Sequence, residues 1–225
     1  MQPTEFIYVG DVMCSWCWGF SPTIQALGER FTIPVRLVNG GLRPGPNAAK
    51  LDDEMRSTLL HHWHQVASVS DQPFDTSFLD RNDGWIYDTE LPAMATVTVR
   101  EMAPELTLPV YERLQRGFYA EAIDVTDPSV YRALIEPFDL DAEAFLAAFG
   151  SETAQRKAWG DFEEARSMGI TGFPALLLRT NGDLAMVTRG WAPIDRIGPA
   201  IEAYLRNQLG AAAEGLVCSI DDPNC

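Results

Sequence analysis

The chain has 225 residues, and its 17 basic and 32 acidic side chains give a net charge of −15. A chain this acidic repels phosphate backbones, which argues against non-specific binding of nucleic acid. No apolar run approaches the length needed to cross a bilayer, so we expect no contact with a membrane. The hydrophobic content of 46% suits a globular core, and the length suggests one core that carries an insertion.

The chain begins Met-Gln-Pro-Thr-Glu, without the basic start and long apolar core of a secretory signal. We therefore expect a cytoplasmic protein. The acidic side chains themselves predict only a solvated surface.

A strand, a helix and a second strand are predicted at the start of the chain. Residues 6–10 form a short apolar run, and residues 16–31 carry apolar side chains at helical spacing. Pro22 falls inside that helix, where it removes a backbone hydrogen bond. Residues 35–38 form the second strand, which ends at Asn-Gly-Gly. So short a strand–helix–strand unit predicts two parallel strands.

A block of helices is predicted to follow. Residues 51–69 read as a helix, as do the apolar positions of residues 110–118 and 145–149, the last after a capping Asp141. Gly169 ends the final helix of this block.

The end of the chain resumes the pattern of strands. Residues 175–178 and 184–189 form an antiparallel pair across a Thr-Asn-Gly-Asp turn, and residues 194–209 form an amphipathic helix. We divide the chain into an N-terminal βαβ half, a helical insertion, a C-terminal ββα half and a loose tail, at residues 1–43, 44–167, 168–209 and 210–225.

The strongest functional signal is the motif Cys14-Ser15-Trp16-Cys17 between the first strand and the first helix. Two thiols at this spacing indicate a dithiol redox centre. The N-terminus of a helix offers unpaired N–H groups and a partial positive charge, which favour a thiolate at Cys14. Cys17 is then spaced to reach back and close a disulfide with Cys14.

This order of elements resembles the thioredoxin fold in its DsbA-like form, an α/β fold with a large α-helical insertion between its two halves. Residues 11–20, Asp-Val-Met-Cys-Ser-Trp-Cys-Trp-Gly-Phe, resemble the active-site segment of the FrnE-like group of DsbA-family protein-disulfide isomerases. Residues 169–175, Gly-Ile-Thr-Gly-Phe-Pro-Ala, resemble the loop that presents a cis-proline to the cysteines. Pro22 also lies where thioredoxins carry a proline that kinks the helix.

The resemblance implies a role for each matching position. Cys14 is then the attacking thiolate, Cys17 resolves the mixed disulfide, and Pro174 is the cis-proline that leaves the neighbouring backbone free for an extended substrate. The implied substrate-binding positions are Trp16, Gly172 and Phe173. We expect Trp16 and Phe173 to be exposed at the thiols, and Trp18 and Phe20 to lie in the core.

The chain departs from the family pattern in two respects. Many members hold a buried carboxylate six residues before the first cysteine, where it relays a proton, whereas this chain has Tyr8. Asp11 is either a substitute or, as we prefer, a turn residue that caps the helix. Residues 1–31 also contain one basic residue, Arg30, so helix N–H groups must stabilise the Cys14 thiolate, and only moderately.

Cys218 and Cys225 form a second cysteine pair, for which three interpretations stay open. The pair exchanges its disulfide with Cys14 and Cys17, forms an inert disulfide bridge, or consists of two free thiols. A zinc site built from all four cysteines is disfavoured because six residues separate this pair. His61, His62 and His64 cannot easily converge from one helix, so no metal is expected.

We therefore predict a thiol–disulfide oxidoreductase that acts on protein or peptide thiols and disulfides, without a bound cofactor. Glutathione or a reductase would set its redox poise. Two alternatives remain: a glutathione-dependent transferase or isomerase of the kappa type, and a non-catalytic adaptor that binds client proteins. The pair of cysteines disfavours the first, because such enzymes usually carry serine there. An adaptor would not need both cysteines and the Phe173-Pro174 loop. The oligomeric state stays open.

Overall fold

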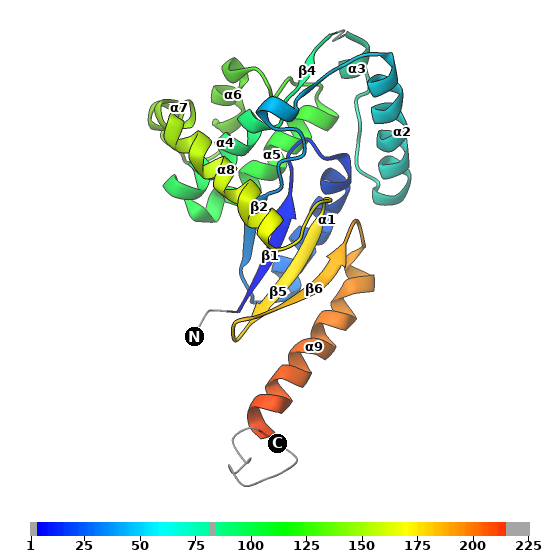
Figure 1. Ribbon diagram of the computed structural model, residues 1–225, viewed down its shortest axis with the longest axis vertical. Coiled ribbons are helices and arrows are strands. Elements are labelled where there is room, and N and C mark those ends of the chain that lie inside the picture. The colour runs from blue at the N-terminus through cyan, green and yellow to red at the C-terminus, as the bar shows by residue number, and fades with distance from the viewer. Residues whose placement is uncertain (1–3, 82–83, 215–225) are drawn as a thin grey trace.

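A four-stranded mixed sheet forms the centre of the fold in the computed structural model, which describes residues 4–81 and 84–214. The strand order is β2-β1-β5-β6, with bounds Val35–Asn39, Glu5–Gly10, Ala175–Thr180 and Asp183–Arg189. Strand β1 runs parallel to β2 and antiparallel to β5, and β5 is antiparallel to β6. The predicted strands, their directions and the DsbA-like thioredoxin fold class are confirmed (Figure 1).

The turn between β5 and β6 follows from its sequence. Asn181 and Gly182 both adopt positive φ, at 53° and 97°. A two-residue hairpin turn with two left-handed positions requires residues such as Asn and Gly, because a β-branched side chain there would be strained. This turn sets the register in which β6 returns along β5.

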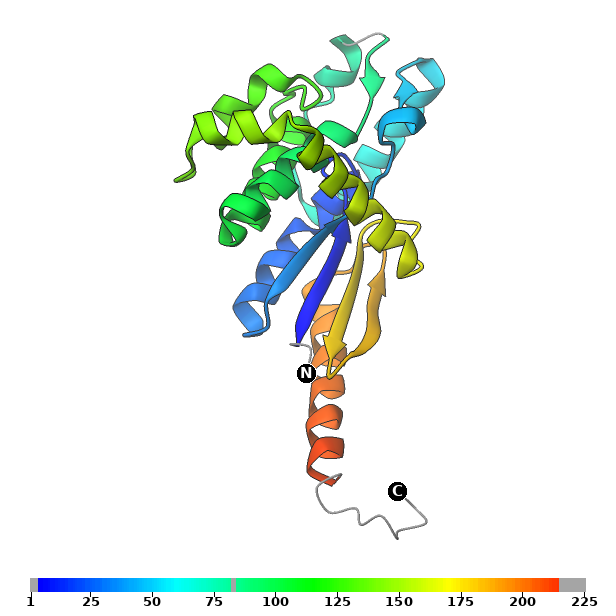
Figure 2. The same cartoon turned by 60° about the vertical axis from the view of Figure 1, so that its left-hand side comes forward.

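Two helices belong to the thioredoxin-like halves. Helix α1 spans Ser15–Arg30 and contains Pro22, as predicted, and α9 spans Ile194–Glu214. The prediction that the chain is a loose tail from residue 210 was wrong over its first residues, because α9 continues to Glu214. Three consecutive alanines, residues 211–213, explain the extension, since alanine has the highest helix propensity. Figure 2 shows α9 extending away from the sheet.

The segment between the two halves is mainly helical. Its α-helices are α2 (Asp53–Ser70), α3 (Ser77–Arg81), α4 (Glu90–Met102), α5 (Thr107–Ala120), α6 (Tyr131–Ile135), α7 (Ala142–Phe149) and α8 (Glu152–Ser167). Single 3-10 turns lie at Gly45–Asn47, Pro104–Leu106 and Pro128–Val130. The predicted cap is confirmed, because the Asp141 carboxylate accepts from the backbone N–H groups of Glu143 and Ala144.

A two-stranded ribbon within this segment was not predicted. Strands β3 (Ala49–Lys50) and β4 (Ile86–Tyr87) pair antiparallel. Two residues are too few to show the alternation by which a strand is recognised in sequence. The ribbon matters for the site because it carries Tyr87 to the thiols.

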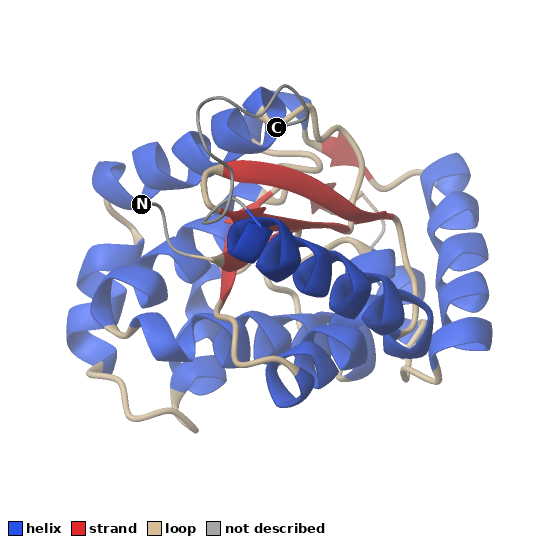
Figure 3. Ribbon diagram, turned by 90° about the horizontal axis from the view of Figure 1, so that it is seen from below, coloured by secondary structure: helices blue, strands red, loops and turns tan. Residues whose placement is uncertain are grey.

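The helices bury both faces of the sheet (Figure 3). Side chains of β1 alternate between two apolar clusters: Phe6 and Tyr8 join the large one with α1 and α5, and Ile7 and Val9 join a smaller one with Ala165 of α8. Residues 6–9 of β1 are therefore apolar without a break, as expected of a strand covered on both faces. Within the described parts of the chain, no helix is long and apolar enough to cross a membrane.

Candidate active site

The two cysteines lie at the point where β1 gives way to α1. Cys14 is the N-cap residue of α1, and its carbonyl accepts from the backbone N–H groups of Cys17 and Trp18, at 2.9 and 3.1 Å. Both cysteines are free thiols. Cys14 is 7% exposed and Cys17 is 0% exposed. Cys14 therefore keeps a small solvent-exposed surface, whereas Cys17 has none.

The loop that contains Pro174 lies against Cys14. The Phe173–Pro174 peptide bond is cis, which confirms the state expected for Pro174. The Cys14 thiol donates to the Phe173 carbonyl oxygen at an Sγ–O distance of 3.6 Å. The Pro174 carbonyl in turn accepts from the Gly190 backbone N–H at 2.7 Å, at the end of β6. Two halves of the thioredoxin-like fold thus meet at the accessible thiol.

The three predicted substrate-binding residues differ in how far they are exposed to solvent. Gly172 is exposed, and Trp16 and Phe173 are each half-buried. The Phe173 ring packs over Gly40, where an added Cβ would lie 2.2 Å from a ring carbon. Phe173 is therefore held against the end of β2 and is less free than an exposed lip residue. Trp18 is 0% exposed, as predicted.

A hollow of about 310 Å³ lies beside this loop. Gly172 and Phe173 line one side of it, and Arg189 and Gly190 line the other. A Cβ added at Gly172 would meet no atom within 4 Å, so the backbone there is open. Phe173, whose carbonyl oxygen accepts from the Cys14 thiol, lines the hollow, so the hollow lies next to that thiol.

Burial dominates the environment of Cys17. Desolvation raises the pKa of its thiol well above the ordinary value, and the neighbouring Cys14 raises it further. The Asp11 backbone and the Tyr8 hydroxyl oppose this effect in part and lower the pKa of the thiol. Tyr8 occupies the position that the sequence singled out, and its hydroxyl oxygen lies 3.4 Å from that of Tyr111.

Asp11 does not cap helix α1, so that expectation was wrong. Cys14 occupies the cap position, and no side chain bonds the helix end there. Asp11 is buried, and its two carboxylate oxygens accept from the backbone N–H groups of Met13 and Leu42, at 2.9 and 2.8 Å. Desolvation raises the pKa of Asp11 to about 6 despite these bonds. Asp11 therefore joins the cysteine turn to the chain after β2.

Three tyrosines at the site escaped the sequence analysis. Tyr111 and Tyr119 come from α5, and Tyr87 comes from β4. The Tyr87 hydroxyl donates to the Met13 carbonyl, directly before Cys14. All three are buried. The sequence did not reveal them because each lies at least 70 residues from the motif, Tyr111 and Tyr119 on an amphipathic helix and Tyr87 on a two-residue strand.

Arg116 is a further residue near the site that the sequence analysis did not identify. Its guanidinium lies 5.8 Å from the centre of the Trp18 ring, over a side chain of the active-site helix. Arg30 is the one basic residue of residues 1–31, and the fold brings a further cation, Arg116 of α5, to the active-site helix.

The remaining candidates do not join the site. Cys218 and Cys225 lie outside the described residues. His61 and His64 are exposed on α2 and His62 is half-buried. Among the described residues no cluster of three or more His, Cys, Asp or Glu side chains could hold a metal ion. A cavity of about 720 Å³ lies between α1 and α5 and not at Cys14, so we assign the site from its chemistry and not from its volume.

The family described as DSBA-like thioredoxin domain matches residues 7–201, which include both cysteines and Pro174. The chain belongs to this family. Among solved structures, a Nitrosomonas europaea protein provisionally named a protein disulfide isomerase is 31% identical, with a TM-score of 0.84, and the match covers 92% of this chain and 99% of that one. The cytosolic disulfide reductase DsbM of Pseudomonas aeruginosa is 25% identical, with a TM-score of 0.72 over 92% and 99% of the two chains.

Two curated relatives carry a different name. The ClpXP adapter protein SpxH of Bacillus licheniformis is 23% identical over 179 residues, and that of Halalkalibacterium halodurans is 20% identical over 187 residues. Each match covers 78% of this chain but only 57% and 58% of the respective relative. This family member therefore spans little more than half the length of the curated relatives.

Proposed function

We propose that this protein is a thiol–disulfide oxidoreductase that acts on protein or peptide substrates through Cys14 and Cys17. The observation that carries the proposal is the contrast between the two thiols: Cys14 is accessible at a helix N-terminus beside the cis-proline loop, and Cys17 is sealed beneath it. This arrangement permits attack by one thiol and resolution by the other. The names of the two similar structures, a protein disulfide isomerase and a disulfide reductase, support the same general activity.

The chemistry follows from this contrast. The Cys14 thiolate attacks one sulfur of a substrate disulfide, forms a mixed disulfide and releases the other sulfur as a thiolate. Deprotonated Cys17 then attacks Cys14, which forms the Cys14–Cys17 disulfide and releases the second substrate sulfur. The reverse sequence oxidises a dithiol. Glutathione is the small thiol that we propose as redox partner, since a DsbM structure of the same fold was determined with it.

Capture of the mixed disulfide tests the proposal. In Cys17→Ser the resolving thiol is absent, so a disulfide-bonded peptide should remain attached at Cys14 and be visible by mass spectrometry. Cys14→Ser is the matched control, because the remaining thiol of the motif, Cys17, is 0% exposed and should capture nothing at that position. Equal capture by both variants, or by neither, would contradict the proposed roles.

A non-catalytic adaptor is the second candidate, favoured by the names of the curated relatives. A variant in which both Cys14 and Cys17 are replaced by serine distinguishes the two candidate functions. An adaptor keeps its binding of client proteins in that variant, whereas an oxidoreductase loses all turnover of disulfides. The location of the protein in the cytoplasm is part of the same proposal, and it agrees with the name of the cytosolic DsbM reductase.

A further inference from the structure

Arg189 is the last residue of β6, and its side chain is exposed. Arg179 on the neighbouring strand β5 pairs with Glu5 at 2.6 Å, whereas the Arg189 guanidinium forms no ion pair within residues 4–81 and 84–214. The chain has 32 acidic side chains for 17 basic ones, so an unpaired cation is not explained by a shortage of carboxylates. The guanidinium is therefore available to a group from outside this part of the chain.

The pairing of β5 with β6 places Arg189 beside the loop that contains Pro174. Arg189 is the ladder partner of Ala175, which follows Pro174 directly, and the next residue, Gly190, donates its N–H to the Pro174 carbonyl at 2.7 Å. Side chains directly opposite in an antiparallel pair lie on the same face of the sheet, about 5 Å apart. Arg189 therefore lies on the face where Ala175 joins the smaller apolar cluster beneath α8.

The hollow of about 310 Å³ connects Arg189 with this loop. Its lining residues are Ile170, Thr171, Gly172, Phe173, Arg189 and Gly190. Arg189 has the one charged side chain among these six. Thr171 is exposed, and its hydroxyl has no hydrogen-bond partner among the described residues. A carboxylate in the hollow can thus accept from a guanidinium and a hydroxyl, and no acidic lining residue repels it.

The hollow is also next to the reactive sulfur, because the Phe173 carbonyl oxygen accepts from the Cys14 thiol at 3.6 Å. An extended peptide that reacts at Cys14 therefore passes the hollow with the residues that flank its own sulfur. The guanidinium and the thiol lie at the two ends of the same short loop. This arrangement lets one side chain read the charge next to the reacting cysteine.

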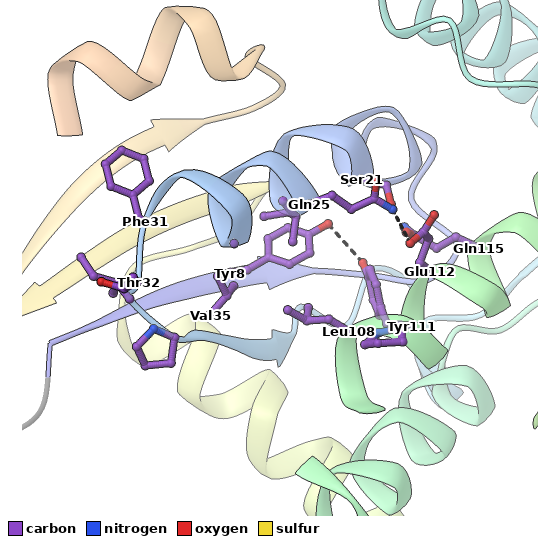
Figure 4. Close-up of a pocket in the computed structure, with 15 residues that line it drawn as sticks. Tyr8, Ser21, Gln25, Phe31, Thr32, Val35, Leu108, Tyr111, Glu112 and Gln115 are labelled. Atoms are coloured by element: carbon purple, nitrogen blue, oxygen red, sulfur yellow. Dashed lines mark hydrogen bonds between the residues drawn. The ribbon is translucent and has the colours of Figure 1, made fainter. Parts of the chain in front are cut away.

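The cavity between α1 and α5 does not offer the same chemistry. Figure 4 shows the residues that line it, around Tyr8 and Tyr111. Glu112 has the one charged side chain among these residues, and it accepts from the Gln25 amide at 2.6 Å. A carboxylate would be repelled there. We therefore place the acidic group of a substrate in the hollow beside the thiol.

We propose that Arg189 binds a carboxylate of the substrate, so that the protein prefers peptide disulfides with an Asp or Glu side chain next to the cysteine. The proposal rests on the thiol–disulfide exchange proposed above and deepens it by naming the substrate class. A guanidinium presents parallel N–H donors that match the two oxygens of a carboxylate. Arg189 contacts the substrate away from the reacting sulfur, so it determines specificity and takes no part in bond exchange.

Single-turnover reduction of two matched peptide disulfides tests the preference. Each is a symmetrical dimer of one short peptide, with Glu on both sides of the cysteine in the first and Gln in the second. The reduced protein supplies both electrons: two peptide thiols form as Cys14 and Cys17 become a disulfide. Reduction of the same peptides by dithiothreitol gives their intrinsic ratio of rates, and selectivity is the ratio with the protein divided by that intrinsic ratio.

We expect a selectivity of about fivefold for the Glu peptide in the wild type, because the contact is an exposed charge pair. Added salt should lower it, since exposed charges are screened. Arg189→Gln should remove the selectivity and leave the rate with the Gln peptide unchanged. A selectivity in Arg189→Gln equal to that of the wild type would overturn the proposal.

Arg196→Gln is the matched control. Arg196 is also exposed and forms no ion pair in the described part of the chain, and the substitution changes the net charge equally. It lies on α9, whose residues Ile197 and Ile201 pack in the large apolar cluster on the opposite face of the sheet. We expect this variant to keep the wild-type selectivity. An equal loss in both variants would show an effect of net charge alone and would contradict a contact at Arg189.

Glutathione disulfide, which also carries carboxylates, supplies the last comparison. If Arg189→Gln slows its reduction and leaves the selectivity between the peptides unchanged, then the hollow serves a small thiol and the proposed substrate class is wrong. If the wild type reduces neither peptide, then the oxidoreductase proposal itself fails. If the wild type reduces both peptides without selectivity, then only the role of Arg189 fails.

Discussion

Trp16 is the residue of the motif that lies between the two thiols, and it is half-buried beside the accessible one. Its exposed surface gives an extended peptide an apolar contact that a small thiol does not use. We expect Trp16→Ala to lower the rate of peptide disulfide reduction by about fivefold, equivalent to about 1 kcal/mol of lost apolar contact. The rate with a small disulfide should change little. Equal losses with both substrates would contradict this role.

Asp11 gives a prediction about pH. Because burial raises the pKa of Asp11 to about 6 from 3.8, the folded protein binds this proton more tightly than the unfolded chain does. The stabilisation is present below the unfolded pKa and is lost as the pH rises through about 6. The shift corresponds to about 3 kcal/mol. Denaturant unfolding should therefore show a loss of stability between pH 4 and pH 7 that is absent in Asp11→Asn.

Asp127 provides a contrast of opposite sign. It is exposed, and hydrogen bonds from Ser129 lower the pKa of its carboxyl. Its small contribution to the stability of the folded protein is therefore present above the unfolded pKa and is lost as the pH falls. If Asp11→Asn showed the wild-type pH dependence, or changed it as Asp127→Asn does, the environment of Asp11 described above would be wrong.

At the scale of elements, the Asp161 carboxylate joins the helical insertion to the sheet at a buried position. Asp161 of α8 is 5% exposed and accepts from both Arg100 terminal nitrogens, at 3.0 and 2.9 Å. It also accepts from the backbone and side-chain nitrogens of Asn39 at the end of β2, at 3.0 and 2.8 Å. One side chain thus ties together α4, α8 and β2 near the Cys14 end of the sheet.

Asp161→Asn should therefore destabilise the protein strongly. The change leaves Arg100 without its charge partner, and we expect a loss of about 2 kcal/mol in denaturant unfolding, below the value for a wholly buried pair because Arg100 is 25% exposed. Glu143→Gln is the matched control, since its pair with Arg132 is 81% and 54% exposed and contributes little. A similar small loss in both variants would contradict the role assigned to Asp161.

Some of the helices, strands and caps could be predicted from the sequence, and others could not. Local apolar patterns and turn residues revealed the four main strands, helix α1 and the Asp141 cap. The two-residue strands of the β3–β4 ribbon are too short to show an apolar alternation in the sequence. The final turns of α9 contain three alanines that we had assigned to the tail. Asp11 was misassigned because its partner Leu42, which is 31 residues away, cannot be seen in the local sequence.

At the scale of the whole molecule, the site combines residues that the chain order separates. The motif and the Pro174 loop could be predicted because each is a short segment that resembles a known family. The tyrosine pair could not, because Tyr8 and Tyr111 are 103 residues apart and meet only when α5 packs against α1 and β1. The insertion therefore contributes side chains to the buried side of the dithiol as well as covering the sheet.

The dithiol itself remains the central claim. Equilibration of the full chain in graded glutathione buffers, followed by alkylation of free thiols and mass spectrometry of each cysteine, tests it most directly. The account predicts a reversible transition in which Cys14 and Cys17 lose their free thiols together and form one disulfide. A Cys14 that never pairs with Cys17, or that carries only glutathione, would contradict it and favour the transferase or the adaptor.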